Sequence, residues 1–232
     1  MEKTKKLIII GDSAFAEIAY EYFTHDSNFQ VIGFSVEKEY LKKQTLFDLT
    51  IVPFEELEDH YDPSQCYFYV AIVYTQLNRL RTRLYAEAKK KGYQPASYIS
   101  SKAFVWNNCQ IGEHSFIFEN NVIQPFVKIG NNVILWSGNH IGHHSIIDDN
   151  CFISSHVVIS GFVEVGKNCF MGVNATIANN VKISNDCLVG AGTLILKDTE
   201  EDKVIRGIAS EAGGSAKRIS KVKGTPCGAN KD

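Results

Sequence analysis

Between residues 99 and 195 the chain repeats a pattern of six positions. Every sixth residue is a large aliphatic one, the position four later holds nothing larger than Asn or Val, and glycine often follows the aliphatic residue. A period of six fits neither an α-helix, with about 3.6 residues per turn, nor a strand that alternates with a period of two. It is typical of a β-helix of very short strands joined by turns, in which the aliphatic side chains fill the interior. The aliphatic series is Ile99, Val105, Ile111, Ile117, Ile123, Ile129, Leu135, Ile141, Ile147, Ile153, Ile159, Val165, Met171, Ile177, Ile183, Val189 and Ile195.

The first hundred residues follow a different pattern, in which apolar runs alternate with helical periodicity. The pattern predicts strands at 7–10, 29–36, 50–54 and 66–73, a helix that ends near 23 and an amphipathic helix at 76–91. Strands that alternate with helices imply a small parallel sheet. We therefore expect an α/β domain in front of the β-helix.

Composition and charge narrow the range of partners. The chain has 232 residues, 44% of them hydrophobic, and 24 Lys and Arg against 26 Asp and Glu. A net charge this close to zero argues against nucleic acid or an anionic membrane as the main partner. No apolar run reaches the roughly 18 residues that a membrane-spanning helix needs. Residues 1–10 contain too few apolar residues to form the hydrophobic region of a signal peptide. We therefore expect a cytoplasmic protein.

Four of the six cysteines occupy the small position of the repeat. A free cysteine behaves as a small hydrophobic residue, which suits that position. A cysteine metal site needs ligands at short spacings such as C-x-x-C, and the sequence has none. We therefore predict buried thiols and no metal site. The four are Cys109, Cys151, Cys169 and Cys187.

Two local features could carry chemistry. The loop 11–17 follows the first strand, where a parallel sheet can bind phosphate at a helix N-terminus. The loop lacks G-x-G-x-x-G, so no nicotinamide cofactor is expected, and an ordinary turn remains the alternative. The second feature is a cluster of three histidines, His140, His143 and His144. They are either surface turn residues or a general base, for which the ordinary histidine pKa of about 6.5 is suited.

Taken together, both halves of the chain resemble the NeuD/PglD-like sugar acyltransferases, which include bacterial UDP-4-amino-sugar N-acetyltransferases. The resemblance covers about residues 5–210. It implies a Rossmann-like domain at 1–97 that holds a nucleotide-linked sugar, and a left-handed parallel β-helix at 98–198 that holds acetyl-CoA. A C-terminal segment follows at 199–232. It also implies a homotrimer with active sites between neighbouring β-helices.

The resemblance implies a set of substrate-binding residues in the N-terminal domain. The family loop G-A-S/G-G-H-A/G-K aligns with residues 11–17, and paired acids after the second strand align near Glu37. The family motif G-N-N-x-x-R places its last Asn and Arg on residues 78 and 81. The implied substrate-binding residues are Gly11, Asp12, Ser13, Ala14, Glu37, Asn78 and Arg81.

The catalytic stretch of the family, I-x-H-E-C-x-I-G, aligns with residues 141–148. His143 falls on the catalytic histidine, which makes it the implied general base. His144 stands where the family has Glu, and Phe152 stands where it has a second histidine. The group that orients His143 stays open among His144, His140, Asp148 and Asp149.

The acetyl-CoA site of the family lies along the last coils. The glycine-rich last coil matches residues 190–192, and the adenine segment matches residues from 207 onward. Gly161, eighteen residues after His143, is a candidate by spacing for the N–H that stabilises the oxyanion. The implied cofactor-binding residues are Gly161, Gly190, Ala191, Gly192, Gly207 and Ile208.

The activity implied by the resemblance is the transfer of acetyl from acetyl-CoA to the amino group of a nucleotide-linked sugar. A 4-amino-4,6-dideoxy sugar is expected, attacked directly without an acyl-enzyme, and UDP, dTDP and GDP remain open. Acetylation of a sugar hydroxyl is one alternative. A non-catalytic trimeric scaffold or nucleotide-sensing subunit is the other. Trp106, Phe118 and Trp136 are expected to be exposed on one copy and covered by its neighbours.

Overall fold

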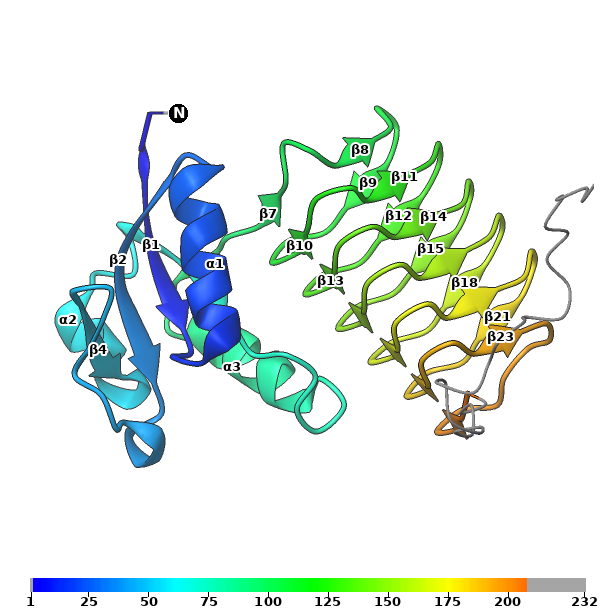
Figure 1. The fold of residues 1–232 in the computed structure, drawn as a ribbon. Helices are drawn as coiled ribbons and strands as arrows, with labels where there is room; N and C mark the ends of the chain where they lie inside the picture. The colour runs from blue at the N-terminus through cyan, green and yellow to red at the C-terminus, as the bar shows by residue number, and fades with distance from the viewer. Residues whose placement is uncertain (1, 208–232) are drawn as a thin grey trace, which may run out of the picture.

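The computed structural model describes residues 2–207, which form an α/β domain beside a stack of coils (Figure 1). The sheet of the N-terminal domain has the order β3-β4-β2-β1-β5-β6, and all neighbours except β3 and β4 pair in parallel. The strands are β1 (Lys5–Ile10), β2 (Phe29–Val36), β3 (Thr45–Leu46), β4 (Leu49–Pro53), β5 (Cys66–Val70) and β6 (Gln94–Pro95). The helices are α1 (Ala14–His25), η1 (Lys38–Tyr40), η2 (Phe54–Glu56), α2 (Leu57–His60) and α3 (Arg79–Lys90).

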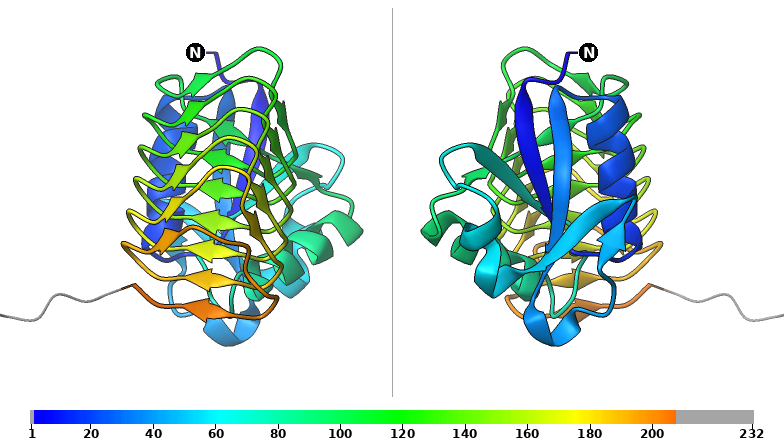
Figure 2. Two further views of the ribbon diagram at one scale, coloured as in Figure 1. Left: turned by 90° about the vertical axis from the view of Figure 1, so that its right-hand side faces the viewer. Right: turned by 90° about the vertical axis from the view of Figure 1, so that its left-hand side faces the viewer.

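The coils form three parallel sheets of two-residue strands, which we call faces 1, 2 and 3 (Figure 2). Face 1 contains β7 (Tyr98–Ile99), β10 (Phe116–Ile117), β13 (Ile134–Leu135), β16 (Phe152–Ile153), β19 (Phe170–Met171), β22 (Leu188–Val189) and β24 (Val204–Ile205). Face 2 contains β8 (Phe104–Val105), β11 (Val122–Ile123), β14 (His140–Ile141), β17 (Val158–Ile159), β20 (Thr176–Ile177) and β23 (Leu194–Ile195). Face 3 contains β9 (Gln110–Ile111), β12 (Lys128–Ile129), β15 (Ile146–Ile147), β18 (Glu164–Val165) and β21 (Lys182–Ile183). The predicted fold class is confirmed.

The six-residue repeat fixes this architecture because each coil takes eighteen residues. Ile123 pairs with Ile141 in the next coil, and Ile141 pairs with Ile159. The aliphatic positions from Ile117 to Ile195 are buried, whereas Ile99 is 42% exposed because it lies at the open end of the stack. The expectation that every aliphatic residue of the series fills the interior is therefore wrong for Ile99, whereas Val105 and Ile111 of the same coil are partly buried against the core.

From His114 to Gly192, each turn of the β-helix contains a residue in the left-handed region. Its φ lies between 56° and 67° at the non-glycine positions of the β-helix from His114 to Asp186. Asparagine and aspartate tolerate this conformation best, which explains their recurrence at this position. Phe126, His144 and Phe162 share the position and its conformation, so three aromatic rings follow one another along one corner of the stack.

The two domains share a hydrophobic core. Phe15 and Phe23 of α1 pack against Phe116 of face 1, with ring centroids 5.7 and 5.6 Å apart. Phe118 is buried against the same helix, and the Trp136 ring lies 5.5 Å from that of Phe15. The N-terminal domain thus covers two of the aromatic residues that we expected a neighbouring copy to cover. In Figure 1, α1 accordingly lies between the sheet and the coils.

Three predicted boundaries differ from the structure by three or more residues. The helix expected from residue 76 begins at Arg79, because Gln76, Leu77 and Asn78 have φ values of 53°, 50° and 67° and cannot be part of a right-handed helix. The fourth strand ends at Val70 instead of Val73. β24 continues face 1 past residue 198, where we expected the β-helix to end.

Candidate functional site

A cavity at the carboxyl ends of β1, β2 and β5 brings together four of the predicted substrate-binding residues. Gly11, Asp12, Ser13 and Glu37 line this cavity, whose volume is about 340 Å³. Ligands of open parallel sheets bind in the crevice at this end of the strands. Ala14 is exposed at the first position of α1, next to the cavity but not among its lining residues.

The single glycine of the loop has a local structural cause. Gly11 has a φ of 127°, and a Cβ atom there would lie 2.9 Å from the carbonyl oxygen of Ala71. Its N–H donates to the carbonyl oxygen of Ser35 at 2.7 Å. Only glycine combines this φ with so close an approach to another backbone. Beyond it, the Ser13 side chain makes no capping hydrogen bond, so the first turn of α1 keeps N–H groups that can receive an anion.

Glu37 is fixed by an ion pair at the edge of the cavity. Its carboxylate lies 2.9 Å from a guanidinium nitrogen of Arg83 on α3, and this hydrogen bond raises the pKa of Arg83. Tyr40 and Thr75 line the same cavity but were not among the predicted residues. They come from a short 3₁₀ turn and from a loop, so no sequence periodicity distinguishes them.

Asn78 and Arg81 occupy a different place from the predicted one. Both are fully buried, and both form hydrogen bonds with the backbone of the β-helix. Arg81 donates to the carbonyl oxygens of Asn132 and Cys151, each at 3.2 Å, and Asn78 donates to that of Cys169, also at 3.2 Å. This position differs from the expected contact with a nucleotide sugar. The structure gives the two residues the role of connecting α3 to the β-helix.

His143 and His144 lie at the corner between face 2 and face 3, in the turn after β14. Both side chains are exposed, and their Nδ1 atoms are 3.1 Å apart. The His144 ring is stacked between Phe126 and Phe162, with ring centroids 4.5 and 4.8 Å away. The aromatic stack therefore holds His144, and His144 contacts the edge of His143.

Gly161 lies directly beside the imidazole ring of His143. A Cβ atom at Gly161 would be 2.8 Å from Cε1 and 2.9 Å from Nε2 of that ring. The Gly161 N–H, expected to stabilise the oxyanion, donates to Oδ1 of Asn179 at 2.9 Å. The carbonyl oxygen of the thioester would have to displace the Asn179 side chain before the Gly161 N–H could stabilise the oxyanion.

The other residues considered as partners of His143 lie elsewhere. Asp149 accepts from the backbone N–H of Asn131 at 2.8 Å and forms an ion pair with Lys167. Asp148 lines a separate pocket on face 3, and His140 belongs to strand β14 of face 2. In residues 2–207 the one hydrogen-bond contact of the His143 ring is therefore His144.

An apolar groove of about 410 Å³ follows the corner between face 1 and face 2. Tyr74, from the loop after β5, covers one side, and its ring lies 5.3 Å from Phe152 and 4.7 Å from Phe170. Trp136 and Ala191, the latter a predicted cofactor-binding residue, also line the groove. Tyr74 and Phe170 were not among the predicted site residues, although the eighteen-residue spacing between Phe152 and Phe170 places these two phenylalanines on face 1.

The last coils pack with little room between backbones. A Cβ atom at Gly190 would lie 3.0 Å from the nitrogen of Gly207, and one at Gly207 would lie 2.1 Å from the carbonyl oxygen of Ala191. Gly192 has a φ of 66° and open space beside it. The predicted residue Ile208 lies outside the described residues.

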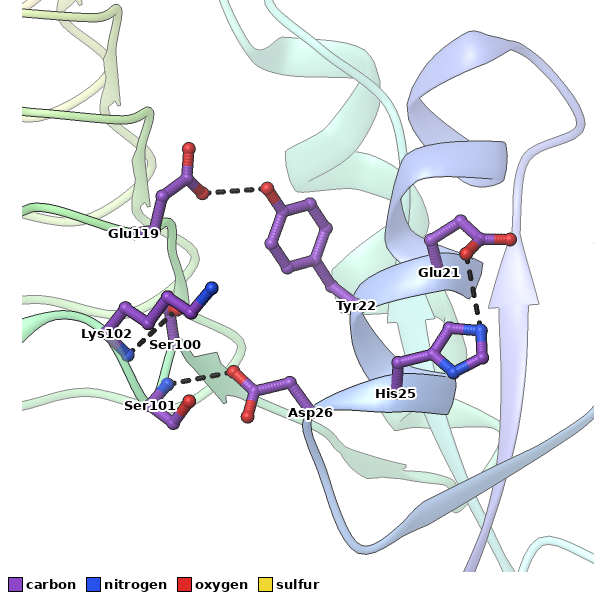
Figure 3. A pocket seen from close by; sticks show the side chains of 8 residues that line it. All are labelled: Glu21, Tyr22, His25, Asp26, Ser100, Ser101, Lys102 and Glu119. Carbon is purple, nitrogen blue, oxygen red and sulfur yellow. Dashed lines mark hydrogen bonds and ion pairs between the residues drawn. The ribbon is translucent and has the colours of Figure 1, made fainter.

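A further pocket, shown in Figure 3, lies where α1 meets the first coil and contains none of the predicted residues. Its acidic groups already have partners in the joint between the domains. The Tyr22 hydroxyl donates to Glu119 at 2.7 Å, and the backbone N–H of Ser101 donates to Asp26 at 2.9 Å. Burial, reinforced by the bond to Glu119, raises the pKa of Tyr22 to about 12.

Among residues 2–207, no three His, Cys, Asp or Glu side chains are placed to hold a metal ion. None of the helices in this range has the length and apolar character needed to cross a membrane.

The two uncovered faces of the β-helix differ in character. The outward residues of face 2 include Phe104, Val122, Val158 and Leu194, which are 37% to 61% exposed. Face 3 instead presents Gln110, Lys128, Glu164 and Lys182. Exposed apolar stripes of this kind mark protein–protein interfaces. Face 2 is therefore the candidate surface for contact with another copy.

Sequence comparison finds one family, described as the GMPPB C-terminal domain, which matches residues 93–205. This range contains the β-helix. No curated protein matches the chain in sequence.

Solved structures match both domains. The acetyltransferase domain of PglB from Neisseria gonorrhoeae FA1090 is 20% identical, covers 88% of this chain and 97% of its own, and has a TM-score of 0.79. The same domain in complex with acetyl coenzyme A is matched at 18% identity, with coverage of 88% and 96% and a TM-score of 0.62. PerB from Caulobacter crescentus, in complex with CoA and GDP-perosamine, is 22% identical, with coverage of 90% and 97% and a TM-score of 0.77. The chain shares the complete two-domain fold of these proteins.

Proposed function

We propose that this protein is an acetyl-CoA-dependent N-acetyltransferase that acetylates the amino group of a nucleotide-linked amino-dideoxy sugar. One observation carries the proposal: the cavity lined by Gly11 and Glu37 and the exposed His143 occur on a fold that is shared, over 90% of the chain, with PerB. That protein binds CoA and GDP-perosamine. The cavity offers a place for the nucleotide, His143 offers a base, and the fold matches that of PerB, so all three features support the same acetyl transfer.

The nucleotide would bind in the cavity of the N-terminal domain. Its phosphates would meet the N–H groups at the start of α1, next to Ser13, where an anion is stabilised by the helix dipole. The exposed ring of Tyr40 offers a stacking surface for the base. Glu37 offers a carboxylate to ribose hydroxyls or to base N–H groups.

The apolar groove supports a deoxy sugar as the acceptor. Its aromatic residues, Tyr74, Trp136, Phe152 and Phe170, suit the C–H faces and methyl group of a 4-amino-4,6-dideoxy sugar better than a sugar with many hydroxyls. The loop after β5 contributes to both sites, since Tyr74 lines the groove and Thr75 lines the nucleotide cavity. A nucleotide sugar could therefore extend from one site to the other.

The reaction needs a base and a thioester. The sugar amine attacks the acetyl carbonyl carbon of acetyl-CoA while Nε2 of His143 takes a proton from the amine nitrogen. The tetrahedral intermediate then breaks its C–S bond, and the CoA sulfur receives the proton from His143. The acetyl group forms an amide with the sugar nitrogen, and no acyl-enzyme is formed.

We infer that the complete site forms between copies of the chain. His143 lies at the corner between faces 2 and 3, whereas the groove lies at the corner between faces 1 and 2. Packing face 2 of each copy against the next in a closed ring would bring His143 of one copy toward the groove of its neighbour. Such a head-to-tail contact closes with threefold symmetry in a homotrimer.

Thiol release from acetyl-CoA tests the proposal. The assay uses UDP-, dTDP- and GDP-linked 4-amino- and 3-amino-dideoxy sugars with wild type, His143→Asn and the control His60→Asn. His60 is exposed at the end of α2, so the same substitution there leaves the proposed site intact. We expect one amino sugar to be acetylated, with turnover at least about a hundredfold lower in His143→Asn and unchanged in His60→Asn.

Matched sugars with a hydroxyl in place of the amine separate N- from O-acetylation. Turnover with the hydroxyl sugars alone would replace the proposal with an O-acetyltransferase. No turnover together with no stabilisation of the fold by acetyl-CoA would contradict enzyme activity and leave a scaffold, since a ligand that binds the folded state raises its stability.

A further inference from the structure

The ring contact between His143 and His144 restricts the protonation of both residues. Two Nδ1 atoms at 3.1 Å can form a hydrogen bond only if one carries the proton and the other offers its lone pair. If His143 carries the proton on Nδ1, its neutral ring has a free lone pair on Nε2. If His144 carries it, the neutral ring of His143 has its proton on Nε2 and cannot act there as a base.

His144 is held in place on both faces of its ring. The ring planes of Phe126 and Phe162 are inclined to it by 27° and 17°, so the three rings form one continuous stack. The backbone N–H of His144 donates to the carbonyl oxygen of Pro125 at 3.1 Å. The stack fixes the plane of the His144 ring, and its Nδ1 atom faces Nδ1 of His143 at 3.1 Å.

His143 is fixed by three further contacts. Its backbone N–H donates to Oε1 of Gln124 at 2.9 Å, and its ring meets Phe162 edge-on at 5.1 Å. Gly161 lies against the ring, because a Cβ atom there would be 2.8 Å from Cε1 of His143. In this position the exposed ring presents its Nδ1 atom to that of His144, and the hydrogen bond between them depends on which nitrogen atom carries the proton.

We propose that His144 is a positioning residue, whose Nδ1 accepts the hydrogen bond from Nδ1–H of His143 and so keeps Nε2 of His143 free as the base. This inference rests on the proposed function, because it assigns Nε2 the task of taking the proton from the acceptor amine. During the reaction the amine proton moves to Nε2 of His143, and the Nδ1–H bond to neutral His144 remains. The proton on Nε2 then passes to the CoA sulfur as the C–S bond breaks, which restores the starting pair.

Two substitutions separate the acceptor atom from the aromatic stack. His144→Phe removes Nδ1 but keeps a ring, and the left-handed backbone accepts it because Phe126 and Phe162 have the same conformation one coil away, with φ of 67° and 58°. His144→Gln restores a neutral acceptor oxygen. We expect kcat to fall at least about tenfold in His144→Phe, as part of the 10²–10⁴ that a positioned base contributes, and to recover in His144→Gln. The KM for acetyl-CoA and the melting temperature should stay the same.

Nitrogen-15 NMR of histidine-labelled protein supplies a readout that does not depend on activity. In wild type we expect Nδ1 of His143 to carry the proton, and in His144→Phe we expect the proton to move to Nε2, the form favoured by a free imidazole. If no sugar is acetylated but this tautomer change occurs, the hydrogen bond stands and the proposed function fails. An unchanged tautomer, or a His144→Phe variant with wild-type kcat, overturns the positioning role.

Discussion

The Nε atom of Arg81 lies 3.0 Å from Oδ1 of Asn132, across the interface between α3 and the β-helix. The guanidinium is fully buried, and its partners within residues 2–207 are neutral oxygen atoms, among them the carbonyls of Val73 and Cys151. Burial lowers the pKa of Arg81 to about 10. A buried cation that is held by neutral oxygen atoms depends on the complete set of these hydrogen bonds.

Replacement of Arg81 by lysine should therefore destabilise the protein. Lysine keeps the charge but loses the planar fork, and several carbonyl oxygens would lose their donor. We expect a loss of about 2–4 kcal/mol in the free energy of unfolding, measured with urea. The matched control is Arg79→Lys, because Arg79 forms an exposed ion pair with Asp186. Arg79→Lys should change the free energy of unfolding by less than about 1 kcal/mol. Equal losses in the two variants would contradict a special role for Arg81.

Acid should destabilise the same interface through His114. Nε2 of His114 accepts the backbone N–H of Val70 at 2.9 Å, and Nδ1 lies 2.9 Å from Oδ1 of Asn132. Full burial lowers the pKa of His114 from 6.5 to about 3. Below pH 6.5 the unfolded chain binds a proton that the folded protein does not, so stability falls with pH until about pH 3.

This single proton corresponds to a slope of about 1.4 kcal/mol per pH unit in the free energy of unfolding. Urea denaturation at several pH values between 7 and 4 measures it. His114→Gln should be less stable at pH 7 but should lose this component of the slope. His25→Gln, at an exposed histidine, should keep it, and a slope unchanged in His114→Gln would contradict the assignment.

The oligomer should depend on face 2 and not on face 3. We expect the wild type to sediment as three chains and Val158→Lys to sediment as one, because the substitution places a charge in the middle of the apolar stripe. Glu164→Lys puts the same residue at the same strand position on face 3 and should leave the trimer intact. Dissociation by Glu164→Lys alone would assign the interface to the other face.

The sequence predicts the β-helix almost completely because its geometry is local. Each hexad sets its own strand, its own turn and its own inward side chain, so the register from Ile117 to Ile195 follows from spacing alone. The N-terminal sheet is predicted less completely. The left-handed residues Gln76, Leu77 and Asn78 lie in a stretch with helical periodicity, which gives no sign of the break.

The candidate site is predicted only in part because much of it is non-local. The nucleotide loop and His143 lie within short motifs, whereas the groove forms where Tyr74 meets Phe152 and Phe170, about eighty to a hundred positions away. Arg81 was assigned from a local motif, and its predicted position was wrong. Its motif is local, but its partners lie 51 and 70 residues further on, so its burial could not be read from spacing.

The space beside His143 gives the most direct test of the site. Gly161→Ala would place a Cβ atom 2.8 Å from Cε1 and 2.9 Å from Nε2 of the His143 ring, so the ring must move. Because that side chain is exposed and can shift, the free energy of unfolding should change by less than about 1 kcal/mol. A displaced base reacts poorly, and we expect kcat/KM for the amino sugar to fall about tenfold to a hundredfold.

The double variant Gly161→Ala with His143→Asn serves as the control. If Gly161 acts through the His143 ring, the glycine substitution should lower activity no further once the ring is absent, which is the non-additivity expected of residues in contact. Additive losses would instead assign Gly161 a separate role, such as an N–H directed at the thioester oxygen. Wild-type activity in Gly161→Ala would mean that the ring does not act from the position seen in the structure.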